Sequence, residues 1–228
     1  MSSRFRFFLL SGTILVMVHA DLAQQAAAGA GKPSSSSSSV YARKLTPTAD
    51  SRLDAGSLSN GMYRSPTLGF SCKIPAGWVL RTEEMNTRDE QAAPDADKSG
   101  RVLLAAFSRP PAAHGEDINS SILIAAESVA AYPGLKEAVQ YFDPVTEIAK
   151  AQGFEVDGDP YEFEVGVKTM VRGDFQKDIG TRVMRQATLV ILVRGYGVSF
   201  TFIGGTEDEV EELIEGLSFG AGTKPHPR

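Results

Sequence analysis

Apolar and polar residues alternate along several segments of this chain, and the alternation predicts β-strands. In the segment 68–75, Phe70, Cys72 and Ile74 share one face and polar residues share the other, which is typical of a half-buried strand. A second clear case is 196–203, whose apolar face consists of Tyr196, Val198, Phe200 and Phe202. Less regular patterns predict further strands at 102–107, 121–126, 161–165, 168–176 and 181–193.

Helical spacing of apolar residues marks two other segments. Between 135 and 149 the spacing continues across Pro144, which favours a single kinked helix over a helix that restarts with Asp143 as its cap. The last helix begins after Thr206, because Thr206 and Glu209 have the spacing of a capping box. The apolar stripe expected to be buried on this helix is Val210, Leu213, Ile214 and Leu217.

The first 20 residues have the features of a secretory signal peptide. Arg4 and Arg6 give a positive start, residues 7–18 are apolar, and Val18-His19-Ala20 supplies small residues for cleavage after Ala20. The apolar stretch is shorter than the roughly 20 residues that a spanning helix needs. We therefore predict an exported protein, periplasmic or extracellular, with no stable membrane insertion after signal cleavage. An anchor that is never cut is the alternative.

Composition then divides the rest of the chain. Residues 21–60 are rich in Ala, Gly and Ser and include an unbroken serine run at 34–39. Such a segment buries too little apolar surface to offset the entropy of ordering, so it is predicted to be a flexible linker. A single folded domain is expected at 61–220, followed by a disordered tail at 221–228.

The net charge limits the kinds of partner that the chain can bind, and the cysteine content limits how its fold can be stabilised. The net charge is −5, which argues against nucleic acid as a partner. Cys72 is the only cysteine, so no internal disulfide can form. Because it lies between Phe70 and Ile74 on an apolar face, we expect its thiol to pack in the core and not to act as a nucleophile.

The order of these parts resembles the PsbP/Mog1-like fold family, which includes DcrB-type bacterial envelope proteins. The resemblance covers about residues 62–219 and starts from Gly69-Phe70-Ser71 and Ile74-Pro75-Ala76-Gly77-Trp78. It implies an α+β domain in which an antiparallel β-sheet is flanked by helices on both faces, an α/β/α sandwich. Members of the family mostly act as non-catalytic binding or assembly modules, and none of their contact residues is matched here.

One loop has part of a calcium-binding pattern. Asp95, Asp97 and Ser99 place oxygen donors at alternate positions before Gly100, as in the first half of such a loop. The twelfth position, where a bidentate glutamate belongs, is Ala106. The pattern therefore favours a plain polar loop, with weak calcium binding as the alternative, and no other cofactor is expected.

Residues for familiar catalytic chemistry are few. A Ser–His–Asp triad or a zinc site needs a rigidly held histidine or several cysteines. The three histidines are His19 in the signal, His226 in the tail and His114 in a loop rich in proline. Two carboxylate pairs remain for acid–base chemistry, Asp157 with Asp159 and Glu162 with Glu164, although exposed strand charge is by far the commoner explanation of such pairs.

These observations favour an exported, non-enzymatic accessory or binding module whose partner is a protein or another envelope component, and not nucleic acid. Two alternatives stay open. One is a weak calcium- or ligand-binding domain that uses the Asp95–Gly100 loop. The other is a hydrolase with a site built from carboxylates.

Overall fold

The computed structural model describes residues 53–92, 100–110, 118–132 and 134–220, and these residues form an α+β structure whose strand pairs are antiparallel. This confirms the predicted class. The α-helices in these ranges are α1 (Thr82–Ala92), α2 (Phe142–Ala151) and α3 (Glu207–Glu215). The strands are β1 (Ser57–Ser59), β2 (Met62–Ser65), β3 (Phe70–Lys73), β4 (Val79–Leu80), β5 (Gly100–Phe107), β6 (Ser121–Ser128), β7 (Glu155–Val156), β8 (Tyr161–Val165), β9 (Lys168–Ile179), β10 (Arg182–Val193), β11 (Tyr196–Gly204) and β12 (Leu217–Phe219).

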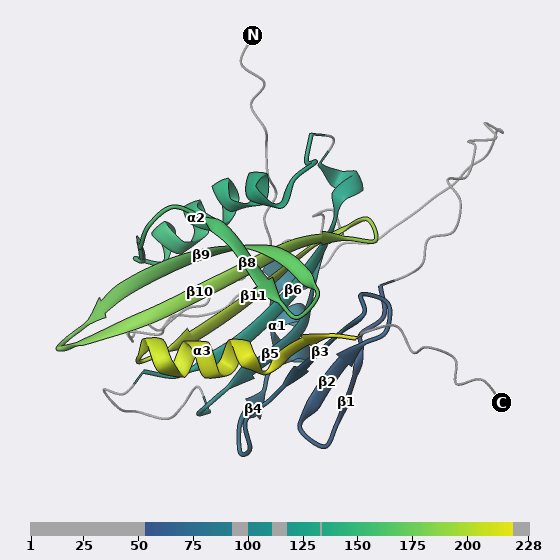
Figure 1. Cartoon of the computed structure of the whole chain (residues 1–228). Coiled ribbons are helices and arrows are strands. Elements are labelled where there is room, and N and C mark those ends of the chain that lie inside the picture. The colour runs from purple at the N-terminus through teal and green to yellow at the C-terminus, as the bar shows by residue number, and fades with distance from the viewer. Residues whose placement is uncertain (1–52, 93–99, 111–117, 133, 221–228) are drawn as a thin grey trace, which may run out of the picture. The chain divides into compact units, whose positions relative to one another are not determined.

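The larger of two sheets contains the long strands of the second half of the chain. Its order is β4-β5-β6-β11-β10-β9-β7, and β8 also pairs with β9 (Figure 1). Between β10 and β11 the chain turns at Arg194 and Gly195, which both have positive φ, 52° and 82°. Two such residues make a tight turn whose twist matches that of the strands it joins. The strands predicted at 102–107, 121–126, 181–193 and 196–203 are all present in this sheet.

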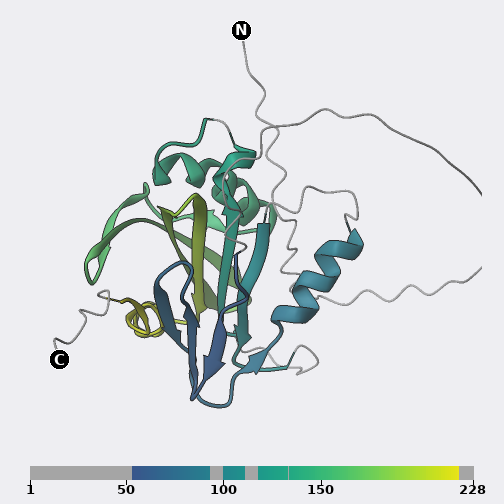
Figure 2. The ribbon, with the colours of Figure 1, turned by 90° about the vertical axis from the view of Figure 1, so that its right-hand side faces the viewer.

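Helices α1 and α2 pack against one face of the larger sheet. Met85 of α1 contacts a cluster that includes Val102 of β5, and the Asn86 side chain both donates to and accepts from the Val102 backbone, at 2.9 and 3.0 Å. Ala149 of α2 belongs to a buried cluster with Phe175 of β9. These contacts fix both helices on the sheet, and Figure 2 shows α1 beside the strands.

A second sheet, which the sequence analysis does not predict, lies on the opposite face. It has four strands in the order β1-β2-β3-β12. Phe70 of β3 and Phe219 of β12 make edge-to-face contacts with Phe200 of β11, with ring centroids 4.9 and 6.0 Å apart. Leu217 belongs to β12 and pairs with Cys72, so its assignment to the last helix is wrong. The helix ends at Glu215, two residues before Leu217.

The folded part also begins earlier than the sequence analysis places it. Ser57–Ser59 form β1, an edge strand, although composition assigns residues 21–60 to a flexible linker. The Tyr63 hydroxyl donates to the Ala55 carbonyl at 3.0 Å, and this bond ties the segment to β2. The predicted signal peptide, the linker up to residue 52 and the tail at 221–228 lie outside the described residues.

Pro144 does not kink a continuous helix. A short 3₁₀ helix (Ala138–Tyr141) ends where α2 begins at Phe142, so Pro144 lies in the first turn of α2. Proline is tolerated there because the first N–H groups of a helix have no partner within it. The preferred single kinked helix is therefore wrong. Asp143 is not the cap either, since it lies inside the first turn and Tyr141 occupies the capping position.

Among the residues that are described, no helix combines the length and the apolar character needed to cross a bilayer.

Candidate functional site

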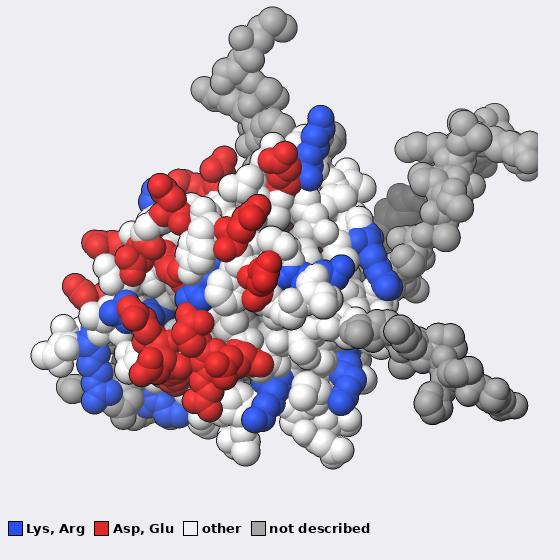
Figure 3. All heavy atoms as spheres, viewed as in Figure 1, with Lys and Arg blue, Asp and Glu red and all other residues white. Residues whose placement is uncertain are grey.

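Two acidic segments that are far apart in the sequence lie together on one side of the molecule. Residues 155–164 contain five carboxylates, residues 207–215 contain six, and neither segment contains Lys or Arg. The first segment includes β7 and β8, and the second is α3. Figure 3 shows acidic side chains gathered over α3 and over the strands above it. We call the exposed carboxylates of these two segments the acidic surface.

Two arginines beneath this surface hold the segments side by side. Nη1 of Arg185, on β10, is 3.1 Å from Glu207 of α3 and 3.9 Å from Asp157, which follows β7. Arg172, on β9, is only 8% exposed and bonds Glu211 of α3 at 2.5 Å. Each arginine thus offsets part of the repulsion that would otherwise separate the segments.

Arg172 is held from several directions. Its Nε donates to Asp174 at 2.9 Å, and its guanidinium lies over the rings of Phe163 and Tyr161 of β8, 5.0 and 5.9 Å from their centroids. The Tyr161 hydroxyl donates to Asp174 at 3.1 Å. Burial lowers the pKa of Arg172, but the hydrogen bonds to Glu211 and Asp174 outweigh burial and raise it. The arginine therefore stays charged and ties β8, β9 and α3 together.

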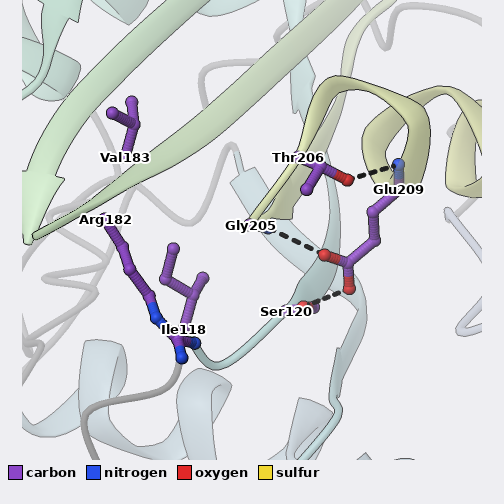
Figure 4. Close-up of a pocket in the computed structure, with 7 residues that line it drawn as sticks. All are labelled: Ile118, Ser120, Arg182, Val183, Gly205, Thr206 and Glu209. Carbon is purple, nitrogen blue, oxygen red and sulfur yellow. Dashed lines mark hydrogen bonds between the residues drawn. The ribbon is translucent and has the colours of Figure 1, made fainter.

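A surface pocket of about 470 Å³ lies at the beginning of α3. Its lining residues come from the segment before β6, from the start of β10 and from the first turn of α3: Ile118, Ser120, Arg182, Val183, Gly205, Thr206 and Glu209. In Figure 4 the Arg182 side chain points toward Ile118, while the Glu209 carboxylate points toward Ser120. The lining thus combines apolar side chains with one cation and one carboxylate.

The Glu209 carboxylate in this pocket already has two donors. Ser120 donates its hydroxyl to one oxygen at 2.5 Å, and the Gly205 N–H donates to the other at 2.8 Å. The Thr206 hydroxyl accepts from the Glu209 N–H at 3.1 Å, so Thr206 is the predicted helix cap. In a full capping box the Glu209 carboxylate would accept from the Thr206 N–H, but here it accepts from the Gly205 N–H. This wall of the pocket closes the helix end and offers no unpaired acid or base.

The structure places the sequence-predicted residues as follows. Asp95, Asp97 and Ser99 lie outside the described residues, and so does His114. Ala106 is fully buried within β5, where it pairs with Ile122 and Leu80. The carboxylates at 157, 159, 162 and 164 are all exposed and belong to the acidic surface. In the described part of the chain, no three His, Cys, Asp or Glu side chains come together in a way that could hold a metal ion.

Cys72 has the environment that the sequence predicts. It has no exposed surface, and burial raises the pKa of its thiol to about 12. A thiol in this state is not a nucleophile at neutral pH.

Sequence reasoning misses one buried carboxylate. Glu127 of β6 is 3% exposed, and the Tyr132 hydroxyl donates to it at 3.0 Å. A second phenol, that of Tyr141, also bonds Glu127, and burial followed by the Glu127 charge raises the pKa of Tyr141 well above its usual value. Tyr141 is thus a neutral donor. The only signal in the sequence is a glutamate within an apolar run, which does not reveal its distant partners.

No protein-family model and no curated protein matches this chain.

Solved structures that resemble it have low sequence identity. One is a Bacteroides thetaiotaomicron protein with 13% identity and a TM-score of 0.37, for which the match covers 73% of this chain and 51% of that one. The chain thus spans about half the length of that protein. A second is the PsbP of the cyanobacterium Synechocystis, with 12% identity, a TM-score of 0.44 and coverage of 70% and 91%.

A third is LpqN of Mycobacterium tuberculosis, described as involved in cell envelope biogenesis. It has 14% identity, a TM-score of 0.33 and coverage of 65% and 82%. Likenesses of this size transfer no activity or partner to this chain.

Proposed function

We propose that this chain is an exported, non-enzymatic binding module that binds a positively charged protein partner through its acidic surface. The observation that carries the proposal is that two segments without a single basic residue are brought together on one side of the fold. A surface of one sign attracts partners of the opposite sign and rejects partners of its own sign.

The acidic surface is also well suited to binding because it is held rigidly while many of its charges stay exposed. Arg172 forms ion pairs with Asp174 and Glu211, and Arg185 forms ion pairs with Glu207 and Asp157. Exposed carboxylates remain on both segments: Glu162, Glu164, Asp208, Glu212 and Glu215. A rigid surface loses little conformational entropy when a partner binds.

We include in this proposal the layered arrangement that the resemblance to the PsbP/Mog1-like fold family implies, with helices on both faces of the antiparallel sheet. The contacts of α1 and α2 lie on one face of the larger sheet. Helix α3 forms an ion pair with Arg172, and Arg172 lies on the other face together with Tyr161 and Phe163. The view in Figure 2, with α1 to one side of the strands and α3 to the other, supports this arrangement. The α3 side then faces the partner, and the location we propose is periplasmic or extracellular.

The test compares two variants with the same change in charge. Asp208→Lys with Glu212→Lys reverses charges on the acidic surface, and Glu83→Lys with Glu147→Lys reverses exposed charges on α1 and α2. Each protein, with a tag, is used to capture proteins from an envelope extract at low salt, and the bound proteins are identified by mass spectrometry.

We expect the native chain to capture a basic protein. The Glu83→Lys/Glu147→Lys variant (the α1/α2 variant) should capture the same protein, whereas the Asp208→Lys/Glu212→Lys variant (the α3 variant) should not. Equal capture by both variants would contradict the proposal, and so would turnover of esters, glycosides or phosphates by the native chain. Calcium titration of the native chain tests the loop that contains Asp95, Asp97 and Ser99 separately, because weak heat that disappears in Asp97→Ala would assign calcium to it.

A further inference from the structure

The strand β8 forms part of the outer edge of the larger sheet. It pairs with β9 on one side only, and no strand pairs with its other side in the part of the chain that is described. Tyr161, Glu162 and Glu164 of β8 are exposed, whereas Val165 is buried. The open length therefore runs from Tyr161 to Glu164. An open edge presents unpaired backbone N–H and C=O groups that can accept a further strand.

The two faces of β8 differ sharply in chemistry. Tyr161 and Phe163 point to the face that carries Arg172, and their rings contact each other at 6.4 Å. Glu162 and Glu164 pair with Val171 and Thr169 and therefore point to the other face. A strand added at this edge would meet aromatic rings on one face and two carboxylates on the other.

These carboxylates select the kind of strand that can pair here. A second copy of β8 would place glutamate beside glutamate, and like charges on neighbouring strands are destabilising. A strand with Lys or Arg two residues apart would instead set each cation beside one glutamate. Glu211 of α3 lies on the opposite face of β8, where it is paired with Arg172, so the preference for a basic segment comes from Glu162 and Glu164.

We infer that β8 is the docking strand of this module, and that it binds an extended protein segment in which basic residues alternate with apolar ones. The segment adds to the edge of the sheet, with its basic side chains beside Glu162 and Glu164 and its apolar side chains beside Tyr161 and Phe163. This inference rests on the proposed function and names the place and the pattern of recognition.

The first test uses a fluorescent ten-residue peptide in which Lys and Val alternate, and the full-length chain at low salt. Binding is followed by fluorescence anisotropy. The comparison peptide has the same composition with its lysines grouped at one end. We expect the alternating peptide to bind more tightly, by roughly tenfold, because only it can pair its backbone and both charges at once.

Two peptides that are N-methylated on either the odd or the even residues test strand addition directly. One of the two loses the backbone groups that face β8, so we expect only that peptide to lose binding. If both N-methylated peptides bind as well as the unmodified one, the contact is electrostatic only and strand addition is wrong.

Charge reversal on the strand gives the matched test on the protein. We expect Glu162→Lys with Glu164→Lys to weaken binding of the Lys/Val peptide roughly tenfold and to bind a Glu/Val peptide instead. Circular dichroism checks that this variant is folded, and Glu83→Lys with Glu147→Lys controls for net charge. If the α3 variant loses the peptide and the β8 variant keeps it, the inference fails while the proposed function stands. If the control variant loses the peptide as fully as the β8 variant, both fail.

Discussion

At the scale of single residues, Cys72 connects burial with reactivity. Because its pKa is raised from 9.0 to about 12, the folded chain keeps the thiol protonated over a pH range in which the unfolded chain loses the proton. Folding stability from this group is fully present below pH 9.0 and is lost as the pH rises toward 12.

We therefore expect Cys72 to resist iodoacetamide at pH 8 in the native protein and to react readily in guanidinium chloride. The physical reason is that the reagent needs an accessible thiolate, and neither access nor charge is available in the fold. Mass spectrometry of the labelled chain gives the measurement. Rapid labelling under native conditions would show that the small sheet opens locally.

Gly173 of β9 allows α2 to approach the sheet closely. A Cβ at this position would lie 2.4 Å from Cε1 of Phe142, the first residue of α2. We expect Gly173→Ala to displace that ring and to lower the free energy of unfolding by about 1–3 kcal/mol. Thermal unfolding measures the loss. Gly220→Ala is the control, since nothing lies within 4 Å of its added Cβ, and equal melting temperatures for the two variants would disprove the close contact.

Residue roles are predictable from the sequence only when the partners are close in the chain. Thr206 with Glu209 and the core position of Cys72 follow from local spacing, and the structure confirms both. Arg172 and Glu127 have partners from other elements, and single-sequence patterns contain no information on such pairs. The acidic surface belongs to the same class, because its two segments meet only through the fold.

At the scale of elements, the start of α3 is the best-specified feature of the chain. The Thr206 side chain satisfies one N–H at the helix end, and the Glu209 side chain satisfies the Gly205 N–H. We expect Thr206→Ala to cost about 0.5–2 kcal/mol of stability, and Thr206→Ser to cost much less because it keeps the hydroxyl. Urea unfolding of both variants measures this. A loss of the same size in Thr206→Ser would mean that the methyl group, not the cap, is what matters.

The elements that the sequence predicts correctly are those with sustained periodicity. The strand β11 alternates clearly between its two faces, whereas β10 is recognised as a long apolar run whose residues 186–191 are all buried. The strands β1 and β12 have only three residues each, too few to show a period, and β12 continues the apolar spacing of α3. The sequence also does not show that α2 begins as a new helix at Phe142, because the 3₁₀ helix before it keeps the apolar residues at an approximately helical spacing.

At the scale of the whole molecule, the acidic surface that is proposed to bind a partner also opposes folding. Eleven carboxylates in two neighbouring segments repel one another, and Arg172 and Arg185 offset only part of this. The repulsion acts over about 30 Å at 0.01 M salt but only about 8 Å at 0.15 M. Folding and binding should therefore respond to salt in opposite directions, since the exposed charges repel each other and attract the partner.

We expect the melting temperature at pH 7.5 to rise between 10 and 150 mM NaCl, while binding of the Lys/Val peptide weakens over the same range. Asp208→Lys with Glu212→Lys removes two negative charges from the surface and adds two positive ones, so it should melt at a higher temperature in low salt and respond less to added salt. Differential scanning calorimetry provides both values. A melting temperature that falls with salt would mean that the ion pairs of Arg172 and Arg185 outweigh the repulsion between the carboxylates. The acidic surface would then have no net repulsion that binding of a basic partner could reduce.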